Sequence, residues 1–317
     1  MTIKESTVNH ERHASHVVDI SAPAPEIFDL IVDVNRWPVI FGPTVHVETE
    51  DASSTQQVLR IWATANGDLR NWTSIRNVDP DTMTVKFRQV ESPPILSSMS
   101  GSWTVEDTDA GSRVTLDHTW TLADDSAADA QTVFTAVDNN SRRELEALRT
   151  ALDSGAVVAH DFSESVTFTG RPEEVLEFIW DGARWPDRLP HVEAVDLTTF
   201  GNDAQLLRMV TAGAGGSHTT ESYRVRRASS IAYKQTTLPA GLIAHAGRWT
   251  VDPADTPDTW TLTSWHGVLL DVAACRDLLQ RPAANPDELK AKVQQSLAAN
   301  SMTTMRHATQ TFEPQSL

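Results

Sequence analysis

The two halves of the sequence are related to each other, and this internal repeat constrains the fold more than any other feature. The apolar pattern of residues 16–31 recurs in residues 164–179, at an offset of 148. Farther along, Gly-Ser-Trp-Thr-Val at 101–105 recurs as Gly-Arg-Trp-Thr-Val at 247–251, at an offset of 146. A self-similar pattern of this kind indicates two copies of one structural unit.

Turn-forming and helix-ending residues repeat together with the apolar pattern. The offset of 148 maps Asp33, Trp37 and Pro38 onto Asp181, Trp185 and Pro186. The apolar residues of the two C-terminal ends align at an offset of 160, so the second copy carries roughly fourteen extra residues within 267–285. A chain of 317 residues suits two domains of about 150 residues each. We therefore predict two domains, residues 1–155 and residues 156–317.

Each repeat has the same predicted order of elements. A short alternating strand comes first, and a helix opened by Pro25 or Pro172 follows, because proline is tolerated in the first helical turn. The Trp-Pro pair closes that helix, since the residue before proline is disfavoured in the α region. Turn signals then separate several strand-like runs, which in the first repeat are residues 56–65, 69–78, 82–90, 101–106 and 112–122.

A long helix completes each repeat. In the first repeat, apolar residues follow helical spacing on one face at positions 133, 137, 145, 148 and 152. One strand, a helix, an antiparallel meander and a long last helix make an α+β pattern. The sequence therefore predicts a curved antiparallel sheet wrapped around the last helix of each repeat, with a cavity between them.

The composition excludes several classes of partner. A formal net charge of -17, spread along the chain, opposes binding to nucleic acid or to an anionic membrane surface. The sequence has neither a signal-peptide pattern nor an apolar run long enough to span a membrane, so we expect a cytoplasmic protein. Cys275 is the only cysteine, which rules out an intrachain disulfide and a thiolate zinc cluster.

Metal and cofactor sites are not expected either. His10, His13 and His16 recur every three residues, but they precede or enter the first strand with no acidic or thiolate partner nearby. The sequence contains no Gly-rich phosphate loop, nucleophile elbow or Cys/His dyad. We therefore predict a protein without a metal ion or a nucleotide cofactor.

One strand-like run carries an unusual polar face. Because side chains alternate along a strand, Arg70, Trp72, Ser74 and Arg76 share one face of the run 69–76. Such a face is typical either of a solvent-facing strand edge with a packed tryptophan or of a cavity wall, in which the guanidinium binds ligand oxygens. The pattern alone leaves both interpretations open.

A second candidate lies on the strand before the first long helix. Asp117 and His118 are adjacent there and are a possible acid–base pair. Adjacent strand residues point to opposite faces, however, so at most one of the two faces the cavity.

Three motifs together resemble a known family. They are the stretch from Ser21 to Phe41 with its Trp-Pro pair, the Trp-Thr-Ser-Ile-Arg run at 72–76, and Gly-Ser-Trp-Thr-Val at 101–105. They look like the polyketide aromatase/cyclases of bacterial type II polyketide synthases, which belong to the START-like or Bet v 1-like helix-grip superfamily. The resemblance covers both halves and is similar to the didomain members that act after a ketoreductase.

The resemblance implies a function and its partners. It implies cyclisation of a ketoreduced poly-β-ketone tethered to an acyl carrier protein, followed by dehydration that makes the first ring aromatic. The ketosynthase and ketoreductase of the synthase are implied as further partners. The rival from another class is a lipid or metabolite binding and transfer protein, because the same fold elsewhere carries ligands without chemistry.

The resemblance also assigns roles to residues. It implies a catalytic role for Arg76, whose guanidinium stays protonated and suits an oxyanion stabiliser and anchor. Ser74 would position a water or the hydroxyl, and His118 would transfer a proton if it faces inward. The family often has a tyrosine where this chain has Thr44. The predicted pocket lining of the first repeat comprises Trp37, Phe41, Arg70, Trp72 and Trp103.

The second repeat departs from the motif. Its corresponding strand reads Ser222-Tyr223-Arg224-Val225-Arg226, in which we match Arg226 to the motif arginine and Ser222 to the tryptophan. Trp185 and Trp249 repeat the predicted lining. The second cavity is therefore expected either to be an altered binding site or to serve a structural or docking role.

Overall fold

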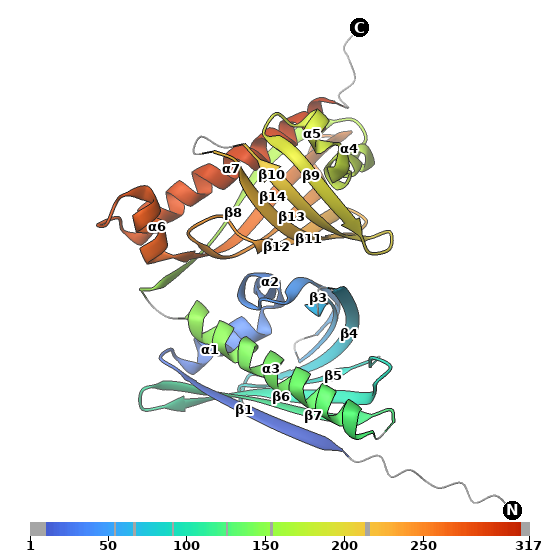
Figure 1. Cartoon of the computed structure of the whole chain (residues 1–317), viewed down its shortest axis with the longest axis vertical. Helices are drawn as coiled ribbons and strands as arrows, with labels where there is room; N and C mark the ends of the chain where they lie inside the picture. Colours follow the sequence, from blue (N-terminus) through green and yellow to red (C-terminus); the bar gives the residue numbers. More distant parts are fainter. Residues whose placement is uncertain are drawn as a thin grey trace, which may run out of the picture. The chain divides into compact units, whose positions relative to one another are not determined.

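The computed structural model describes residues 11–53, 55–65, 68–90, 92–124, 126–152, 155–212 and 216–311. Within these residues the chain forms two seven-stranded antiparallel sheets, one from each half of the sequence (Figure 1). This architecture confirms the predicted α+β fold and its duplication. The exact boundary between residues 155 and 156 stays a prediction.

The first repeat builds its sheet in the strand order β1-β7-β6-β5-β4-β3-β2. Its strands are β1 (Arg12–Ile20), β2 (Thr44–Ala52), β3 (Gln56–Ala65), β4 (Asp68–Asp79), β5 (Thr84–Gln89), β6 (Leu96–Thr108) and β7 (Gly111–Leu122). Its helical elements are α1 (Ala24–Val32), the 3₁₀ turn η1 (Val34–Arg36), α2 (Trp37–Ile40) and α3 (Ala127–Ala151).

The second repeat has the equivalent strand order, β8-β14-β13-β12-β11-β10-β9. Its strands are β8 (Val157–Thr169), β9 (Val192–Thr199), β10 (Ala204–Thr211), β11 (His218–Arg226), β12 (Ser230–Thr237), β13 (Leu242–Pro253) and β14 (Thr259–Asp271). Its helical elements are α4 (Pro172–Trp180), η2 (Gly182–Arg184), α5 (Trp185–Arg188), α6 (Val272–Leu279) and α7 (Pro286–Gln310). Helix α6 lies in the predicted insertion.

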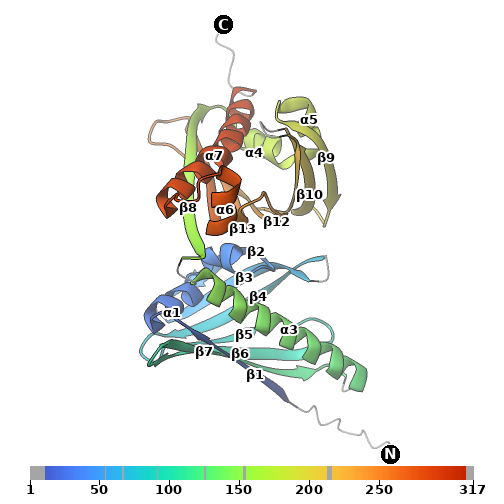
Figure 2. The ribbon, with the colours of Figure 1, turned by 60° about the vertical axis from the view of Figure 1, so that its left-hand side comes forward.

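Each long helix lies against its own sheet. Helix α3 runs along β1 and β7 in both views (Figure 1, Figure 2), and it begins at Ser126, whose side chain accepts a hydrogen bond from the backbone N–H of Asp129. The buried face of α3 consists of Val133, Val137, Ser141, Leu145 and Leu148. The predicted apolar stripe is therefore the packed face, although Leu152 follows the end of the helix and a serine occupies the middle of the face.

The sequence predicts that the Trp-Pro pair closes the first helix, and this prediction is wrong. Helix α1 ends at Val32, and Trp37 and Pro38 begin the separate short helix α2. Trp37 itself has α-helical dihedral angles, φ -56 and ψ -41. Proline at a second helical position needs no N–H partner, and this advantage outweighs the restriction on the preceding residue.

Two glycines let an aromatic ring lie on the sheet. A Cβ atom on Gly101 would lie 2.5 Å from Cζ of Phe87 and 2.1 Å from the carbonyl oxygen of Asp117. A Cβ atom on Gly247 would lie 2.2 Å from the hydroxyl oxygen of Tyr233. The glycine of the Gly-x-Trp motif is therefore required because a ring from the neighbouring strand occupies the space of its side chain.

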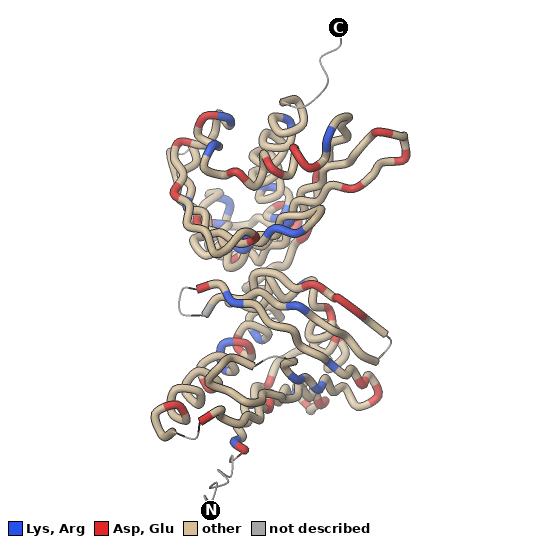
Figure 3. Tube along the Cα trace, turned by 90° about the vertical axis from the view of Figure 1, so that its right-hand side faces the viewer, with Lys and Arg blue, Asp and Glu red and all other residues tan. Residues whose placement is uncertain are grey.

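Edge strands β2 and β9 were not among the predicted elements. In β2 the first four residues are buried and the last four are exposed, so its burial does not alternate as in a half-buried strand. Acidic residues occur along the traces of both halves (Figure 3), as expected for a net charge of -17.

Candidate functional site

Strand β4 carries the predicted polar face. It lies between β3 and β5, so the interpretation of this run as a sheet edge is wrong. Ser74 and Arg76 are buried, with 4% and 1% of their surface exposed, whereas Arg70 at the other end of the strand is exposed. Trp72 is partly buried against an apolar cluster. The face is therefore enclosed at Arg76 and open at Arg70.

The guanidinium of Arg76 is held at the end of helix α1. Its Nη2 donates a hydrogen bond of 2.6 Å to the carbonyl oxygen of Ile31, and it lies 4.7 Å from the ring centre of Trp37. Burial lowers the pKa of Arg76 to about 9, so the group remains charged at neutral pH. Its Nη1 is buried and has no hydrogen-bond partner among the described residues. Arg76 therefore presents an unused donor inside the first repeat.

An unused acceptor lies directly opposite on the neighbouring strand. The backbone N–H of Val78 donates to the carbonyl oxygen of Thr55 at 2.7 Å, and this register pairs Gln57 with Arg76. The Oε1 atom of Gln57 is buried and, within the described chain, has no hydrogen-bond partner. A buried donor and a buried acceptor thus remain unsatisfied at one cross-strand position, which is costly unless a ligand or water binds there.

The second repeat satisfies the same two groups internally. Arg224 Nη1 donates to Gln205 Oε1 at 3.1 Å and to the carbonyl oxygen of Trp180 at 3.3 Å, and its Nη2 donates to the carbonyl oxygen of Ile179. Burial lowers the pKa of Arg224 to about 9 as well. Arg224 is therefore the structural counterpart of Arg76, with its donors occupied.

This geometry corrects the predicted match of Arg226 to the motif arginine. Arg226 is only partly buried and forms an ion pair of 2.5 Å with Glu177. In β4 and β11 the cross-strand partners correspond: Arg76 faces Phe87, and Arg224 faces Tyr233. The motif serine is consequently retained in the second repeat as Ser222, and Thr220 replaces the tryptophan. A shift of two residues keeps every side chain on the same face, so strand periodicity alone did not reveal the error.

His118 faces inward, toward helix α3. Its Nδ1 lies 3.2 Å from the hydroxyl of Ser141, and its ring meets Phe87 edge-on with 5.4 Å between ring centres. Burial lowers the pKa of His118 to about 4, so the imidazole is neutral at pH 7. Arg76 lies three strands away, which at about 4.8 Å per strand is roughly 14 Å. The two groups therefore contact different parts of any ligand that reaches both.

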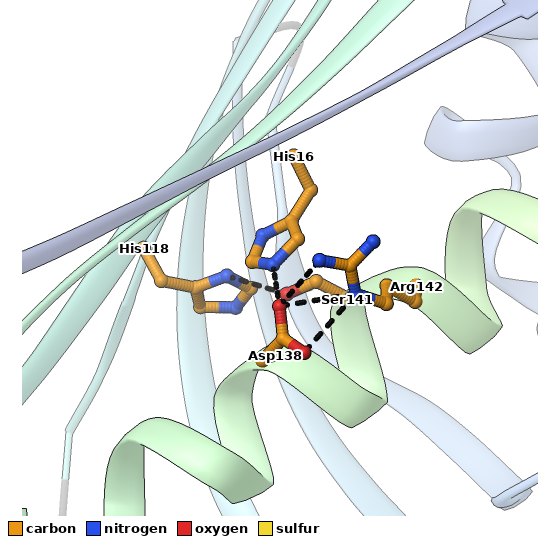
Figure 4. A network of polar contacts seen from close by, with 5 residues as sticks. All are labelled: His16, His118, Asp138, Ser141 and Arg142. Atoms are coloured by element: carbon orange, nitrogen blue, oxygen red, sulfur yellow. Dashed lines mark hydrogen bonds and ion pairs between the residues drawn. The ribbon is translucent and has the colours of Figure 1, made fainter.

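A second histidine, His16, also faces helix α3 and lies near His118 (Figure 4). His16 on β1 has Nε2 2.8 Å from Oδ1 of Asp138, and Arg142 also pairs with that carboxylate at 3.0 Å. Hydrogen bonds from Arg142 and His16 lower the pKa of Asp138. The Nδ1 atom of His16 is buried without a described partner. The carboxylate therefore fixes the orientation of the His16 ring.

The expectation that these histidines lack acidic partners is wrong. His13 lies 3.4 Å from Asp117, and His16 pairs with an aspartate far away in sequence, whereas His10 lies outside the described residues. Asp117 and His118 do point to opposite faces, as predicted. In the part of the chain that the structure describes, no group of three or more His, Cys, Asp or Glu side chains is arranged to hold a metal ion.

The predicted aromatic lining consists mostly of buried residues. Phe41, Trp103, Trp185 and Trp249 are each less than 8% exposed. Trp185 and Trp249 belong to the apolar core cluster of the second repeat. Ser74 donates a hydrogen bond of 3.3 Å to the carbonyl oxygen of Arg88. Packing and backbone contacts thus account for these positions, and their roles in substrate binding stay predictions.

The sequence reasoning missed residues that the repeat itself indicates. At the offset of 148, Gln57 aligns with Gln205 and His118 with His266. At the offset of 160, Ser141 aligns with Ser301. Identical polar residues at corresponding positions of the two repeats could therefore have indicated these site residues. The contact between His16 and Asp138 spans 122 residues and has no sequence signature.

The chain matches one protein family twice. The model of the family described as polyketide cyclase/dehydrase and lipid transport matches residues 11–153 and again residues 159–302. The chain belongs to this family. The two matches correspond to the two repeats, and they confirm the resemblance that the sequence motifs indicate.

Relatives within this polyketide cyclase/dehydrase family are similar over almost their full length. The granaticin polyketide synthase bifunctional cyclase/dehydratase of Streptomyces violaceoruber is 35% identical over 93% of this chain and 92% of its own length. The actinorhodin polyketide synthase bifunctional cyclase/dehydratase of Streptomyces coelicolor is 34% identical, covering 96% of this chain and 98% of its own length.

Solved structures agree with the duplicated helix-grip fold. The didomain aromatase/cyclase BexL from the BE-7585A biosynthetic pathway has a TM-score of 0.86 and 37% identity, covering 96% of this chain and all of that one. StfQ from the steffimycin pathway has a TM-score of 0.80 at 24% identity, over 93% and 97% of the two chains, and supports the fold alone. In the described residues of this family member, none of the helices is long and apolar enough to cross a membrane.

Proposed function

We propose that this protein is an aromatase/cyclase of a type II polyketide synthase. It folds a ketoreduced poly-β-ketone tethered to an acyl carrier protein, closes the first ring and removes water to make that ring aromatic. Support comes from the two relatives named as cyclase/dehydratases, which align over at least nine-tenths of both chains. The description of the family also names lipid transport, so the alternative is a protein that binds or transfers a lipid or metabolite without chemistry.

The unsatisfied pair of Arg76 Nη1 and Gln57 Oε1 carries the proposal at the level of residues. A hydroxyl group satisfies both, because it accepts a hydrogen bond from the guanidinium and donates one to the amide oxygen. An enol oxygen does the same and becomes an enolate when it loses its proton. Ketoreduced poly-β-ketones contain both kinds of oxygen, whereas the alkyl chain of a simple lipid contains neither.

The first repeat supplies the physical requirements of ring closure. Arg76 stays charged and stabilises the enolate oxygen from which the new carbon–carbon bond is formed. Neutral His118 accepts or returns a proton at the other end of the site, with its ring positioned by Ser141. Phe87 lies between the two polar ends and favours a curled chain that brings the reacting carbons together.

The remaining partners follow from this role. The acyl carrier protein delivers the chain, and the ketosynthase and ketoreductase act before this protein in a cytoplasmic synthase. No metal ion or organic cofactor is required for an aldol closure and dehydration of this kind, because the carbonyl groups of the substrate activate the reacting carbons.

The test compares product profiles in a reconstituted minimal synthase with a ketoreductase. Adding this protein should replace spontaneously cyclised products with one product whose first ring is aromatic. Gln57→Leu should lower kcat/KM about 10- to 100-fold, because the hydroxyl loses one of two hydrogen bonds in a buried site. Gln205→Leu is the matched control in the second repeat. An unchanged profile with the wild-type protein would refute the proposed function.

A further inference from the structure

The second repeat keeps the polar positions of the first and adds two more. Strand pairings and helix contacts align the interior residues Ser74, Arg76, Gly101, His118 and Ser141 with Ser222, Arg224, Gly247, His266 and Ser301. Where the first repeat has Phe87 and Met99, the second has Tyr233 and His245. Both changes replace an apolar side chain with one that transfers protons. A repeat that served only as a scaffold would not need them.

These side chains form one connected cluster. His245 Nε2 lies 3.0 Å from His266 Nδ1, and the hydroxyl oxygen of Tyr233 lies 3.1 Å from the same atom. On one side, His245 Nδ1 contacts Gln235 Oε1 at 2.9 Å. On the other side, His266 Nε2 contacts the hydroxyl of Ser301 on α7 at 3.2 Å. The contacts therefore cross the interior of the repeat from strand β12 to helix α7.

The cluster leaves the phenol hydroxyl incompletely bonded. An imidazole nitrogen offers either one N–H or one lone pair, so His266 Nδ1 satisfies only one of its two close partners well. The other nearby nitrogen, His245 Nε2, is 3.5 Å from the Tyr233 hydroxyl, which is long for an O–H···N bond. Whether the phenol donates to His266 Nδ1 or accepts from it, a lone pair or the O–H of Tyr233 stays unused by that bond. Tyr233 consequently has hydrogen-bonding capacity left for a ligand.

The protonation states suit an acid. Burial lowers the pKa of His266 to about 4 and that of His245 far below its usual range, so both rings are neutral. Burial raises the pKa of Tyr233, although the nearby charge of Arg224 opposes that rise. As a whole residue Tyr233 is partly buried, whereas the two histidines are buried. Tyr233 is thus a protonated phenol at neutral pH.

We propose that the second repeat contains its own catalytic site, in which Tyr233 removes water from a β-hydroxyketone. This inference rests on the proposed function, since the β-hydroxyketone is the ring-closed product of the first repeat. Arg224, whose donors are already occupied, acts on this site only through its charge.

The step balances without a co-reactant. The phenol gives its proton to the β-hydroxyl group, which leaves as water. The electron pair of the α-carbon–hydrogen bond becomes the new double bond, and that proton returns to the phenol oxygen. While the oxygen carries negative charge, the N–H of His266 and the charge of Arg224 stabilise it. His266 and His245 are positioning residues in this scheme.

The test uses Tyr233→Phe in the full chain, with the reconstituted synthase and quenched time points. The substitution copies Phe87 of the first repeat and keeps the ring over Gly247, so the fold should be retained; thermal unfolding checks this. We expect the ring-closed hydrate, 18 Da heavier than the dehydrated product, to accumulate as dehydration slows about a hundredfold. Ring closure, the step assigned to Arg76, should continue at the wild-type rate.

Two further variants separate the outcomes. Tyr223→Phe makes the same chemical change at the only other tyrosine, which stacks on Phe200, and should dehydrate normally. His245→Met copies Met99 and should slow dehydration less than Tyr233→Phe does. A wild-type hydrate ratio in Tyr233→Phe would overturn the second site while leaving the proposed function intact. If the wild-type protein itself fails to change the product profile, the proposed function fails instead.

Discussion

Replacing Arg76 by methionine should abolish ring closure and leave the protein nearly as stable as before. Methionine is uncharged and follows the path of the arginine as far as Nε, so it fills much of the space between β4 and the end of α1. A purely structural arginine behaves differently, because its removal destabilises the fold. The substitution therefore tests whether a buried charge is kept for chemistry.

The pKa of Arg76 sets the size of the effect. Burial lowers it from its ordinary value to about 9, which at about 1.36 kcal/mol per pKa unit corresponds to a cost of roughly 5 kcal/mol for keeping the charge in the folded state. The folded-state pKa is the lower one, so this cost applies in full below about pH 9 and lessens above it.

Two contacts offset this cost. The charged hydrogen bond to the carbonyl oxygen of Ile31 contributes about 1.5–3 kcal/mol, and the contact with Trp37 contributes about 2 kcal/mol. The terms nearly cancel, so Arg76→Met should change the free energy of unfolding by no more than about 2 kcal/mol. Removing an ordinary large buried side chain costs about 3–5 kcal/mol.

Urea unfolding at pH 7, followed by tryptophan fluorescence, measures the stability, and the reconstituted synthase measures ring closure. Arg224→Met is the comparison, because it also leaves Gln205 and a second carbonyl oxygen without their donor. It should lose about 3 kcal/mol more than Arg76→Met. A loss above about 4 kcal/mol in Arg76→Met, or ring closure at the wild-type rate, would refute the reasoning.

Three further predictions concern the interior of each repeat. Gly101→Ala should destabilise the protein by about 3 kcal/mol or more in urea unfolding, because its Cβ atom would meet the carbonyl of Asp117 at 2.1 Å; a stable variant contradicts the close approach. In a Tyr223→Phe background, absorbance titration should show Tyr233 ionising above the ordinary range for tyrosine, since burial raises its pKa; an ordinary value contradicts its enclosure. The free energy of unfolding should fall as pH drops from 6.5 towards 4, because His266 takes up its proton at a higher pH in the unfolded chain than in the folded protein. The same fall with pH in the His266→Gln variant would contradict this prediction.

Much of the fold was predictable from the repeat and from periodicity. The run at 56–65 coincides with β3, and the apolar stripe on residues 133–148 is the buried face of α3. Local patterns succeed here because alternation and helical spacing report which face of an element is buried. The prediction that Trp37 and Pro38 end the first helix is wrong, since the same Trp-Pro pair is compatible with the end of one helix and the start of the next.

The candidate site was predictable in part. The alternation along β4 placed Ser74 and Arg76 on one face, and the structure encloses that face. The match of the second-repeat arginine to Arg226 was wrong, because a shift of two residues preserves the face and only the pairing with β12 distinguishes Arg224. That Arg76, Ser74 and His118 act in catalysis stays a prediction.

The sequence by itself determined the duplication, the α+β class and the family, because these depend on patterns that lie within short stretches of chain. Only the tertiary structure decided which polar groups are left unsatisfied. Arg76 and Gln57 lie on different strands, and Tyr233, His245 and His266 come from three strands of one sheet. Whether a buried donor has a partner depends on cross-strand register and on helix packing, and neither is contained in the local spacing of residues.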